Sequence, residues 1–307
     1  MTDAVRAALV VVTLDRADRF AACVLPGLRA SVDAGHDVLV VDQGGPASGT
    51  ARLLRRHPTI RVIHSPRGLS VGRNAALDAT TAPVVVFTDD DVRLPDRWVE
   101  AMLRPFESEV VGAVCGRARA VDGRLLPGAE SGSYTWPTSP FGLGSGFALA
   151  LRRDAVDSVG HFDVSLGAGA RYRAAEDTDM LYRLLREGWT VACIDDATVV
   201  HDDGRNRRGQ LRQYYGYGLG AGAQLAGQAC AGDERAAQLR DESRSAHAKG
   251  AVRSIVRGRL WSAVLQVPYL LGMRRGWREG VAERTSASLT GEQADHAAHA
   301  GKPGADR

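Results

Sequence analysis

Cysteine is scarce in this sequence and widely scattered. The four cysteines among 307 residues, Cys23, Cys115, Cys193 and Cys230, lie far apart, and no two form a Cys-x-x-Cys pair. That spacing favours neither a zinc site nor a disulfide framework. We therefore expect a protein of a reducing compartment, the cytoplasm.

Long apolar runs are also absent. The stretch "ALVVVTLD" near the N-terminus is short and strand-like, without a basic segment or a small-residue cleavage site, so we expect no export signal. The stretch 260–273 is shorter than the roughly 20 residues that cross a bilayer. Trp261, Trp277 and nearby arginines suit peripheral contact with the inner face of the cell membrane, and packing onto the rest of the protein is the open alternative.

No RNA- or DNA-binding motif accompanies the basic residues, so we expect no nucleic-acid partner. The net charge is only +3, and many basic residues fall after residue 200. This asymmetry indicates anionic partners for the C-terminal part of the chain.

Strand-like and helix-like segments alternate through the first two-thirds of the chain. This order predicts an α/β fold with a mostly parallel sheet, right-handed crossovers and helices on both faces. In such a sheet, ligands bind beyond the carboxyl ends of the strands. The expected strands are 8–14, 37–41, 61–64, 84–88 and 110–117, and the expected helices are 17–33, 47–57, 70–79 and 96–106.

The later segments suggest a catalytic domain, 1–203, followed by a helical extension. We expect a loop or hairpin over 118–140, a strand and helix over 144–156, a helix ending at Gly188, and strands over 190–195 and 197–201. The extension, 204–284, is basic, rich in Gly and Ala, and contains an amphipathic helix from Val252 until Pro268. The polar tail, 285–307, is expected to be disordered.

Carboxylates gather where the predicted strands end. "PVVVFTDDD" runs from a buried strand into Asp89, Asp90 and Asp91, and "VLVVD" ends on Asp42. Three adjacent carboxylates repel one another unless a cation or hydrogen-bond donors offset their charge. A solvated acidic turn is the alternative, but the shared edge of the sheet favours a single crevice.

A second acidic group opens the helix in "AAEDTDMLYRLLREGW". Glu176, Asp177 and Asp179 lie in its first turn, where acidic residues also serve to compensate the helix dipole. His201 ends the last predicted strand, as a ligand or as a core residue. Carboxylates and a histidine around one crevice describe a metal-bound anion, such as a diphosphate, and hard oxygen ligands favour Mg²⁺ or Mn²⁺. A positioned carboxylate, for which Asp177 is suited, removes a proton from an acceptor hydroxyl.

The segments "VLVVDQGG", "GLSVGRN", "FTDDDV" and "LGAGARYRAAEDTDMLYRLLREGW", in this order, resemble the family-two glycosyltransferases of the GT-A fold. The resemblance covers roughly residues 8–203. It implies an inverting enzyme that moves a sugar from a nucleoside diphosphate donor, with UDP first, to a glycan, lipid-linked or small-molecule acceptor in cell-envelope synthesis. The sequence departs from the family at Gln43, where Asn or Asp is commoner, and at Gly72, where Ala is usual.

The resemblance also implies the role of each site residue. Asp177 is the base, with Glu176 beside it, and "FTDDDV" is similar to the Asp-x-Asp metal motif. Trp136, in an irregular segment, and Asp179 are the acceptor candidates. The implied donor-binding residues are Thr13, Asp42, Gly68, Arg73, Asn74, Asp89 and Asp90, and the implied metal ligands are Asp91, Asp89 and His201.

Two other functions stay open. A sugar-1-phosphate nucleotidyltransferase has a related fold, but it normally carries a Gly-rich loop after the first strand, where "TLDRADRF" has no glycine. A non-catalytic protein that binds nucleotide sugars or membranes is the other alternative. Turnover of the donor distinguishes such a binder from an enzyme.

Overall fold

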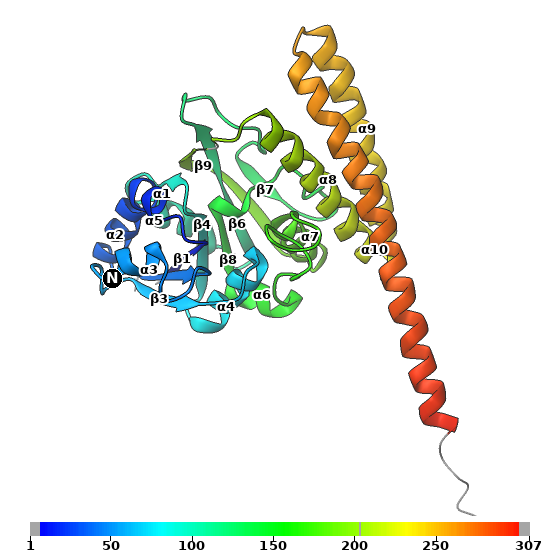
Figure 1. The fold of residues 1–307 in the computed structure, drawn as a ribbon, viewed down its shortest axis with the longest axis horizontal. Helices are drawn as coiled ribbons and strands as arrows, with labels where there is room; N and C mark the ends of the chain where they lie inside the picture. The colour runs from blue at the N-terminus through cyan, green and yellow to red at the C-terminus, as the bar shows by residue number, and fades with distance from the viewer. Residues whose placement is uncertain (1–6, 203, 301–307) are drawn as a thin grey trace, which may run out of the picture. The chain divides into compact units, whose positions relative to one another are not determined.

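The computed structural model describes residues 7–202 and 204–300, with side chains as far as residue 286 (Figure 1). The chain divides into two compact units: Met1–Arg171 with Ala175–Arg205, and Tyr172–Ala174 with Asn206–Arg307. The boundary that we predicted at 203 and the last residues of the predicted tail, 301–307, lie outside the described residues.

Over the described residues, the first unit is built on one nine-stranded sheet with the order β3-β2-β1-β4-β8-β6-β9-β5, and β7 pairs with β9. The first four strands in this order run parallel, whereas β8 is antiparallel to both β4 and β6. This arrangement confirms the predicted α/β class. The strands are β1 (Ala7–Thr13), β2 (Asp37–Asp42), β3 (Arg61–His64), β4 (Val84–Asp89), β5 (Val92–Arg93), β6 (Val111–Ala120), β7 (Gly132–Tyr134), β8 (Leu149–Arg152) and β9 (Thr190–His201).

Helices cover both faces of this sheet, as the apolar run of β4 requires. Val84 and Val86 pack into one apolar core, and Val85 and Phe87 into the other. The first core is closed by α1, α2, α3 and α5, and the second by α4, α6 and α7. The helices are α1 (Ala17–Ala22), α2 (Leu25–Asp33), α3 (Gly49–Leu54), α4 (Leu69–Ala79), α5 (Trp98–Leu103), α6 (Arg153–Val159) and α7 (Glu176–Arg186), with short 3₁₀ helices η1 (Arg104–Glu107) and η2 (Gly146–Ala148).

Two predictions in this unit were wrong. The helix expected over 17–33 is broken into α1 and α2, because Pro26 lacks an N–H and sits in the first turn of the second helix. The two strands expected over 190–201 are one strand, β9, whose pairing with β6 shifts register between Gly116 and Ala118. The polar Asp195 and Asp196 lie in this irregularity and do not pair with β6, and pairing resumes at Val199.

As far as residue 300, the second unit contains three long helices, α8 (Arg207–Cys230), α9 (Glu234–Val256) and α10 (Leu260–Ala300). The predicted helix across 252–267 was wrong, because the chain turns at Gly258, where φ is +67°. Pro268 lies inside α10 and does not end it. None of the helices among the described residues is both long and apolar enough to span a bilayer.

Glycines bring α8 and α10 into backbone contact. A Cβ at Gly218 or Gly222 of α8 would overlap the carbonyl oxygens of Tyr269 or Met273. A Cβ at Gly276 of α10 would overlap the carbonyl oxygen of Leu219 in the same way. The Gly- and Ala-rich composition of this region therefore reflects close helix packing rather than a loop.

Candidate active site

Strand register brings three of the predicted donor-binding residues, Thr13, Asp42 and Asp89, to one edge of the sheet. Thr13, the last residue of β1, lies opposite Asp42 on β2, and Val12 lies opposite Asp89 on β4. The carboxyl ends of three adjacent parallel strands therefore carry their polar residues to the same place, as the sequence predicts.

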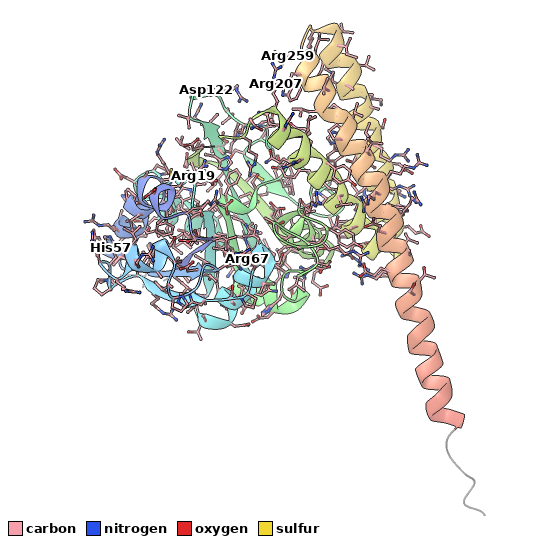
Figure 2. The ribbon with its side chains drawn as sticks, viewed as in Figure 1. Arg19, His57, Arg67, Asp122, Arg207 and Arg259 are labelled. Carbon is pink, nitrogen blue, oxygen red and sulfur yellow. The ribbon has the colours of Figure 1, made fainter. Side chains whose placement is uncertain are left out.

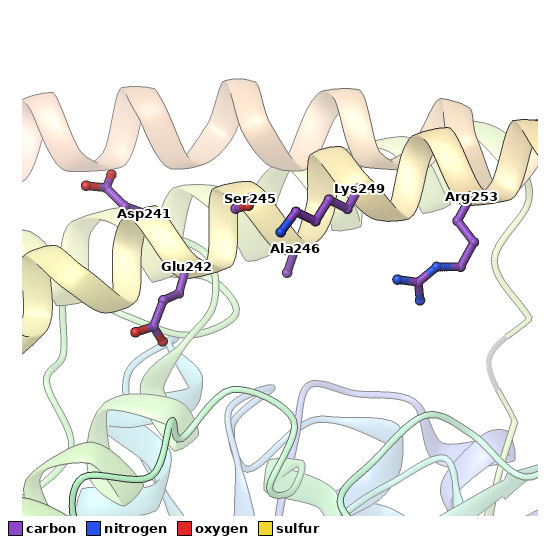
Figure 3. A pocket seen from close by; sticks show the side chains of 6 residues that line it. All are labelled: Asp241, Glu242, Ser245, Ala246, Lys249 and Arg253. Atoms are coloured by element: carbon purple, nitrogen blue, oxygen red, sulfur yellow. The ribbon is translucent and has the colours of Figure 1, made fainter.

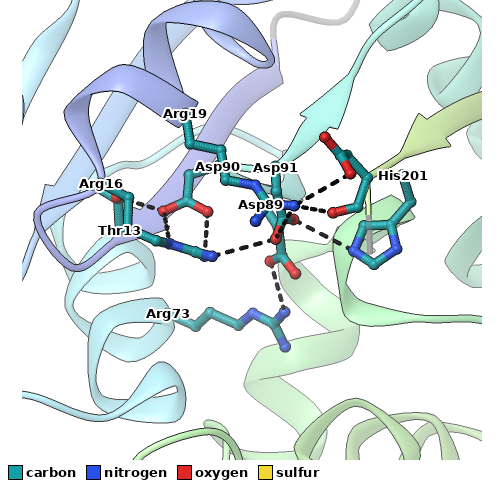
Figure 4. A network of polar contacts seen from close by, with 9 residues as sticks. Thr13, Arg16, Arg19, Arg73, Asp89, Asp90, Asp91 and His201 are labelled. Carbon is teal, nitrogen blue, oxygen red and sulfur yellow. Dashed lines mark hydrogen bonds and ion pairs between the residues drawn. The ribbon is translucent and has the colours of Figure 1, made fainter. Parts of the chain in front are cut away.

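Two arginines after β1 contact Asp90 and Asp91 of the acidic triplet (Figure 4). The buried Asp90 accepts hydrogen bonds from Thr13 Oγ1 at 2.6 Å and from Arg16 Nε at 2.9 Å, and Arg16 Nη2 also donates to it. Asp91 lies 3.3 Å from Arg16 Nη1 and 3.8 Å from Arg19 Nη2. Sequence reasoning missed both arginines, although their position directly after a strand at the ligand-binding edge was a usable signal.

His201 is brought to Asp91 by strand pairing. Val92 of β5, the neighbour of Asp91, pairs with His201 of β9. His201 Nε2 lies 3.4 Å from Asp91 Oδ1, and the imidazole stacks on Phe147 with ring centroids 4.7 Å apart. Two residues 110 positions apart in the sequence, each predicted as a metal ligand, are thus neighbours.

The three aspartates have different proton affinities. Burial raises the pKa of Asp89 to about 6; Arg73 opposes this shift, and Asp91 and Asp90 add to it. Burial also raises the pKa of Asp90, against the opposing hydrogen bond from Thr13 and the charge of Arg16. Burial acts in the same sense on Asp91, but interactions with His201, Arg16 and Arg19 outweigh it and lower the pKa of Asp91. Asp91 is therefore the most firmly ionised of the three.

Arg73 of α4 is buried between two carboxylates. Its Nη1 donates to Glu176 Oε1 at 3.0 Å, and its Nη2 lies 3.9 Å from Asp89 Oδ1. The guanidinium lies over the rings of Phe87 and Phe162 and against Gly146, where a Cβ would overlap it. Burial, with the charge of Asp177, raises the pKa of Glu176 to about 7 in spite of Arg73.

Asp177, the predicted base, follows Glu176 in α7 and is only partly buried. Its Oδ2 accepts a hydrogen bond from Gly146 N at 2.8 Å, and its Oδ1 accepts one from Thr178 N at 2.7 Å. Two backbone donors therefore fix the orientation of a carboxylate that still reaches solvent. The contact with η2 depends on Gly146, which sequence reasoning did not single out.

The predicted acceptor residues make structural contacts. Asp179 is buried and accepts a hydrogen bond from Arg183 Nε at 2.8 Å. Trp136 packs edge-on against Tyr182, with centroids 5.4 Å apart, at the border of the second core. Their roles toward an acceptor stay predictions.

Asp42 and Asn74 are held by nearby backbone and side chains. The fully buried Asp42 accepts hydrogen bonds from Gly44 N at 2.8 Å and from Ser48 Oγ, the N-cap of α3. Asn74 exchanges hydrogen bonds with the backbone of Phe162. Donor binding by either residue stays a prediction.

Gln43 and Gly72, the two departures from the family pattern, lie side by side. Gln43 Nε2 donates to the carbonyl oxygens of Pro66 at 2.6 Å and Gly68 at 2.8 Å. It therefore ties the loop before α4 to the end of β2. A Cβ at Gly72 would come 2.5 Å from Val12 Cγ1 and 3.0 Å from Gln43 Nε2. Gly72 leaves the room that the glutamine occupies.

Residues 9–174, more than half of the chain, match the family described as Glycosyl transferase family 2. The chain belongs to glycosyl transferase family 2. Among its relatives, a pre-mycofactocin glycosyltransferase of Mycobacterium tuberculosis is 30% identical over 61% of this chain and 42% of that protein. The succinoglycan biosynthesis protein ExoM of Rhizobium meliloti is 29% identical over 55% of this chain and 58% of that protein. This family 2 chain thus aligns with less than two thirds of the length of either relative.

Solved structures support the fold of this family 2 chain. The mannosyltransferase PcManGT from Pyrobaculum calidifontis, in complex with GDP-Man and Mn²⁺, superposes with a TM-score of 0.60 and 18% identity over 88% of this chain and 86% of that chain. At this identity the likeness establishes the fold and not the substrate. The predicted GT-A type of fold is confirmed.

The donor set beside Asp91 fits a divalent cation. Asp91 Oδ1 is buried, is not hydrogen-bonded, and faces His201 Nε2, while Asp89 is the nearby second carboxylate. The carboxylate oxygens of this set suit Mn²⁺ or Mg²⁺. Within residues 7–202 and 204–300, however, no three His, Cys, Asp or Glu side chains already stand in a metal-binding arrangement.

Proposed function

We propose that this family 2 chain is a metal-dependent, inverting glycosyltransferase that uses a nucleoside diphosphate sugar. One observation carries the proposal: two sets of contacts meet at the acidic triplet. One set links Thr13 and Arg16 through Asp90 and Asp91 to His201. The other links Asp89 through Arg73 to Glu176, the neighbour of Asp177.

The donor side of the proposed site lies at the ends of β1, β2 and β4. Thr13, Asp42, Gly68, Arg73, Asn74, Asp89 and Asp90 form its walls in the proposal. Asp91, Asp89 and His201 would hold Mn²⁺ or Mg²⁺, which supplies positive charge to the departing diphosphate. Arg16 and Arg19 would contribute further positive charge at the same place. UDP-sugar is our first donor, and the GDP-Man in PcManGT makes GDP-sugars the second.

Asp177 is the proposed general base. It accepts the proton of the acceptor hydroxyl while the acceptor oxygen bonds to the anomeric carbon and the bond from that carbon to the diphosphate oxygen breaks. The hydrogen bonds from Gly146 N and Thr178 N orient the carboxylate for this step. A single displacement of this kind inverts the anomeric configuration. Glu176, paired with Arg73, holds the first turn of α7 in place.

The proposed acceptor is a glycan or lipid-linked sugar of the cell envelope. Support comes from the relative named for succinoglycan biosynthesis. Family membership favours glycosyl transfer over nucleotidyl transfer from a sugar 1-phosphate. It likewise favours an enzyme over a protein that only binds nucleotide sugars.

A donor-hydrolysis screen tests this function. Purified protein is incubated with UDP-, GDP- and dTDP-sugars, with Mn²⁺, with Mg²⁺ and with chelator, and free nucleoside diphosphate is measured. We expect slow release from one donor, dependent on the cation and lost in Asp177→Asn. In a parallel incubation with added pyrophosphate, release of a nucleoside triphosphate would instead assign a nucleotidyltransferase. Binding of a donor without any release or transfer would assign a binding protein.

A further inference from the structure

The turn between α9 and α10 carries apolar side chains into solvent. Val252, Ile255 and Val256 end α9 and are 62%, 57% and 81% exposed, and Leu260, which begins α10, is 65% exposed. Four large aliphatic side chains close to one turn differ from the single exposed residues that soluble proteins normally carry.

The exposed apolar surface continues along α10. Leu260, Val264, Val267 and Leu271 recur at helical spacing, so they share one face, and all are exposed. The opposite face carries Tyr269, Met273 and the glycines that pack on α8. Because α10 already buries one face within its own unit, the second apolar face requires another explanation.

Positive charge accompanies these apolar residues. Residues 243–278 contain no Asp or Glu, although α9 is acidic before this point, at Asp241 and Glu242. These two acids and the cations Lys249 and Arg253 line a pocket along α9 (Figure 3). The charge along this helix therefore changes from negative to positive toward its C-terminus. The cations within 243–278 are Arg244, Lys249, Arg253, Arg257, Arg259, Arg274, Arg275 and Arg278.

The start of α8 adds to the same basic region. The guanidinium of Arg207 lies 5.0 Å from the ring centroid of Trp261, and Trp261 Nε1 donates to Gln210 at 2.7 Å. Arg207 and Arg259 are both labelled in Figure 2. An amphipathic tryptophan beside arginines, next to exposed aliphatic residues, is the composition of a surface that enters the headgroup region of a membrane.

We propose that this basic apolar tip is a docking surface for an anionic lipid bilayer. The tip comprises the exposed residues Val252, Ile255, Val256, Leu260, Val264, Val267 and Leu271 together with Arg253, Arg257 and Arg259. Charge complementarity selects the occupant. Because 243–278 contains no Asp or Glu, like charges oppose a tip-to-tip contact between two copies. Phosphate headgroups accept the arginines while the acyl boundary takes the aliphatic side chains.

Vesicle co-sedimentation of the full chain tests the proposal. The probes are vesicles of phosphatidylcholine alone and of phosphatidylcholine mixed with phosphatidylglycerol. We expect binding to the anionic vesicles only, weakened by added salt. Replacing Arg253, Arg257 and Arg259 with Gln should weaken binding about 100-fold. Replacing Val256, Leu260 and Val264 with Ser should weaken it by at least about tenfold.

Matched controls come from the first unit. Arg29→Gln, Arg56→Gln and Arg124→Gln remove three exposed cations, and Val110→Ser, Val121→Ser and Val164→Ser remove three exposed valines. Both controls should bind vesicles as the unchanged protein does, and all variants should keep their thermal unfolding temperature. Equal binding to both vesicle types, or unchanged binding by the tip variants, would overturn the proposal. A dimer that the serine variant disperses, without vesicle binding, would assign the tip to a second copy instead.

Discussion

Arg73 and Glu176 form a buried ion pair, with Arg73 Nη1 3.0 Å from Glu176 Oε1. The pair joins α4, which begins at the donor-side loop, to the first turn of α7, which carries Asp177. Arg73 also lies 3.9 Å from Asp89, at the end of β4. The buried guanidinium of Arg73 therefore connects the helix that carries the proposed base to the strand end that carries the acidic triplet.

Stability should fall between about pH 5 and pH 7 because of Glu176. Its pKa rises from 4.5 to about 7 on folding, so the folded protein holds the proton more tightly than the unfolded chain does. Protonated Glu176 therefore adds its full contribution to the free energy of unfolding below its unfolded-state pKa. That contribution, up to about 3 kcal/mol, is lost as the pH rises through the folded-state pKa. Glu176→Gln should flatten this decline in urea unfolding measured across the range. Asp89, with a pKa of about 6, leaves a smaller decline of the same sign. An unchanged slope in the variant would contradict the assignment.

Asp177→Asn should abolish sugar transfer and leave donor binding intact. The amide keeps the shape of the side chain but no longer accepts a proton, so the loss falls on kcat. If proton transfer contributes as general bases usually do, kcat falls by about 10² to 10⁴. Steady-state kinetics measures kcat, and calorimetry measures the affinity for the donor. Wild-type turnover in Asp177→Asn would remove the residue from the role of base.

Asp91→Ala should remove the dependence of donor binding on Mn²⁺. Asp91 has a buried oxygen that is not hydrogen-bonded, facing His201, so its loss removes the firmest anionic ligand of the proposed metal site. Calorimetry of donor binding with and without Mn²⁺ measures this effect. Asp96→Ala, an exposed aspartate in the following loop, is the matched control and should bind as wild type does. Metal dependence retained in Asp91→Ala would place the cation elsewhere.

Gly276→Ala should destabilise the helical unit, whereas Gly250→Ala should not. A Cβ at Gly276 overlaps the carbonyl oxygen of Leu219, so α8 and α10 must separate, at a loss of about 1–3 kcal/mol. At Gly250 the nearest atom is 3.9 Å from the added Cβ, so the better helix propensity of alanine adds up to about 1 kcal/mol. Thermal unfolding followed by circular dichroism compares the two. Equal shifts in both variants would show that Gly276 is not required for packing of α8 against α10.

Much of the fold could be predicted, because buried parallel strands leave a strong local signal. The run Val84–Phe87 is apolar at every position since both of its faces are covered, and Gly188 ends α7 at φ +96° as expected. The grouping of strand-end carboxylates followed from parallel topology alone. The helix breaks at Val24 and Gly258 were missed, because a proline within the first turn and a glycine within a periodic pattern each allow two interpretations.

The contacts that organise the site could not be predicted in the same way. Arg16 with Asp90, and Asp177 with Gly146, join positions far apart in the sequence, and their pairing depends on side-chain directions that strand and helix periods do not give. The sequence identified the acidic partner in each case. The partners, Arg16 in the loop after β1 and Gly146 before β8, are known only from the structure.

The contact between Gln43 and Gly72 links the two departures from the family pattern. A Cβ at position 72 would come 2.5 Å from Val12 Cγ1 and 3.0 Å from Gln43 Nε2, so alanine at 72 requires both neighbouring side chains to move. Positions 43 and 72 are therefore sterically coupled, and we expect them to vary together among relatives. Correlated variation at 43 and 72 across relatives would show that the loop before α4 and the end of β2 change together.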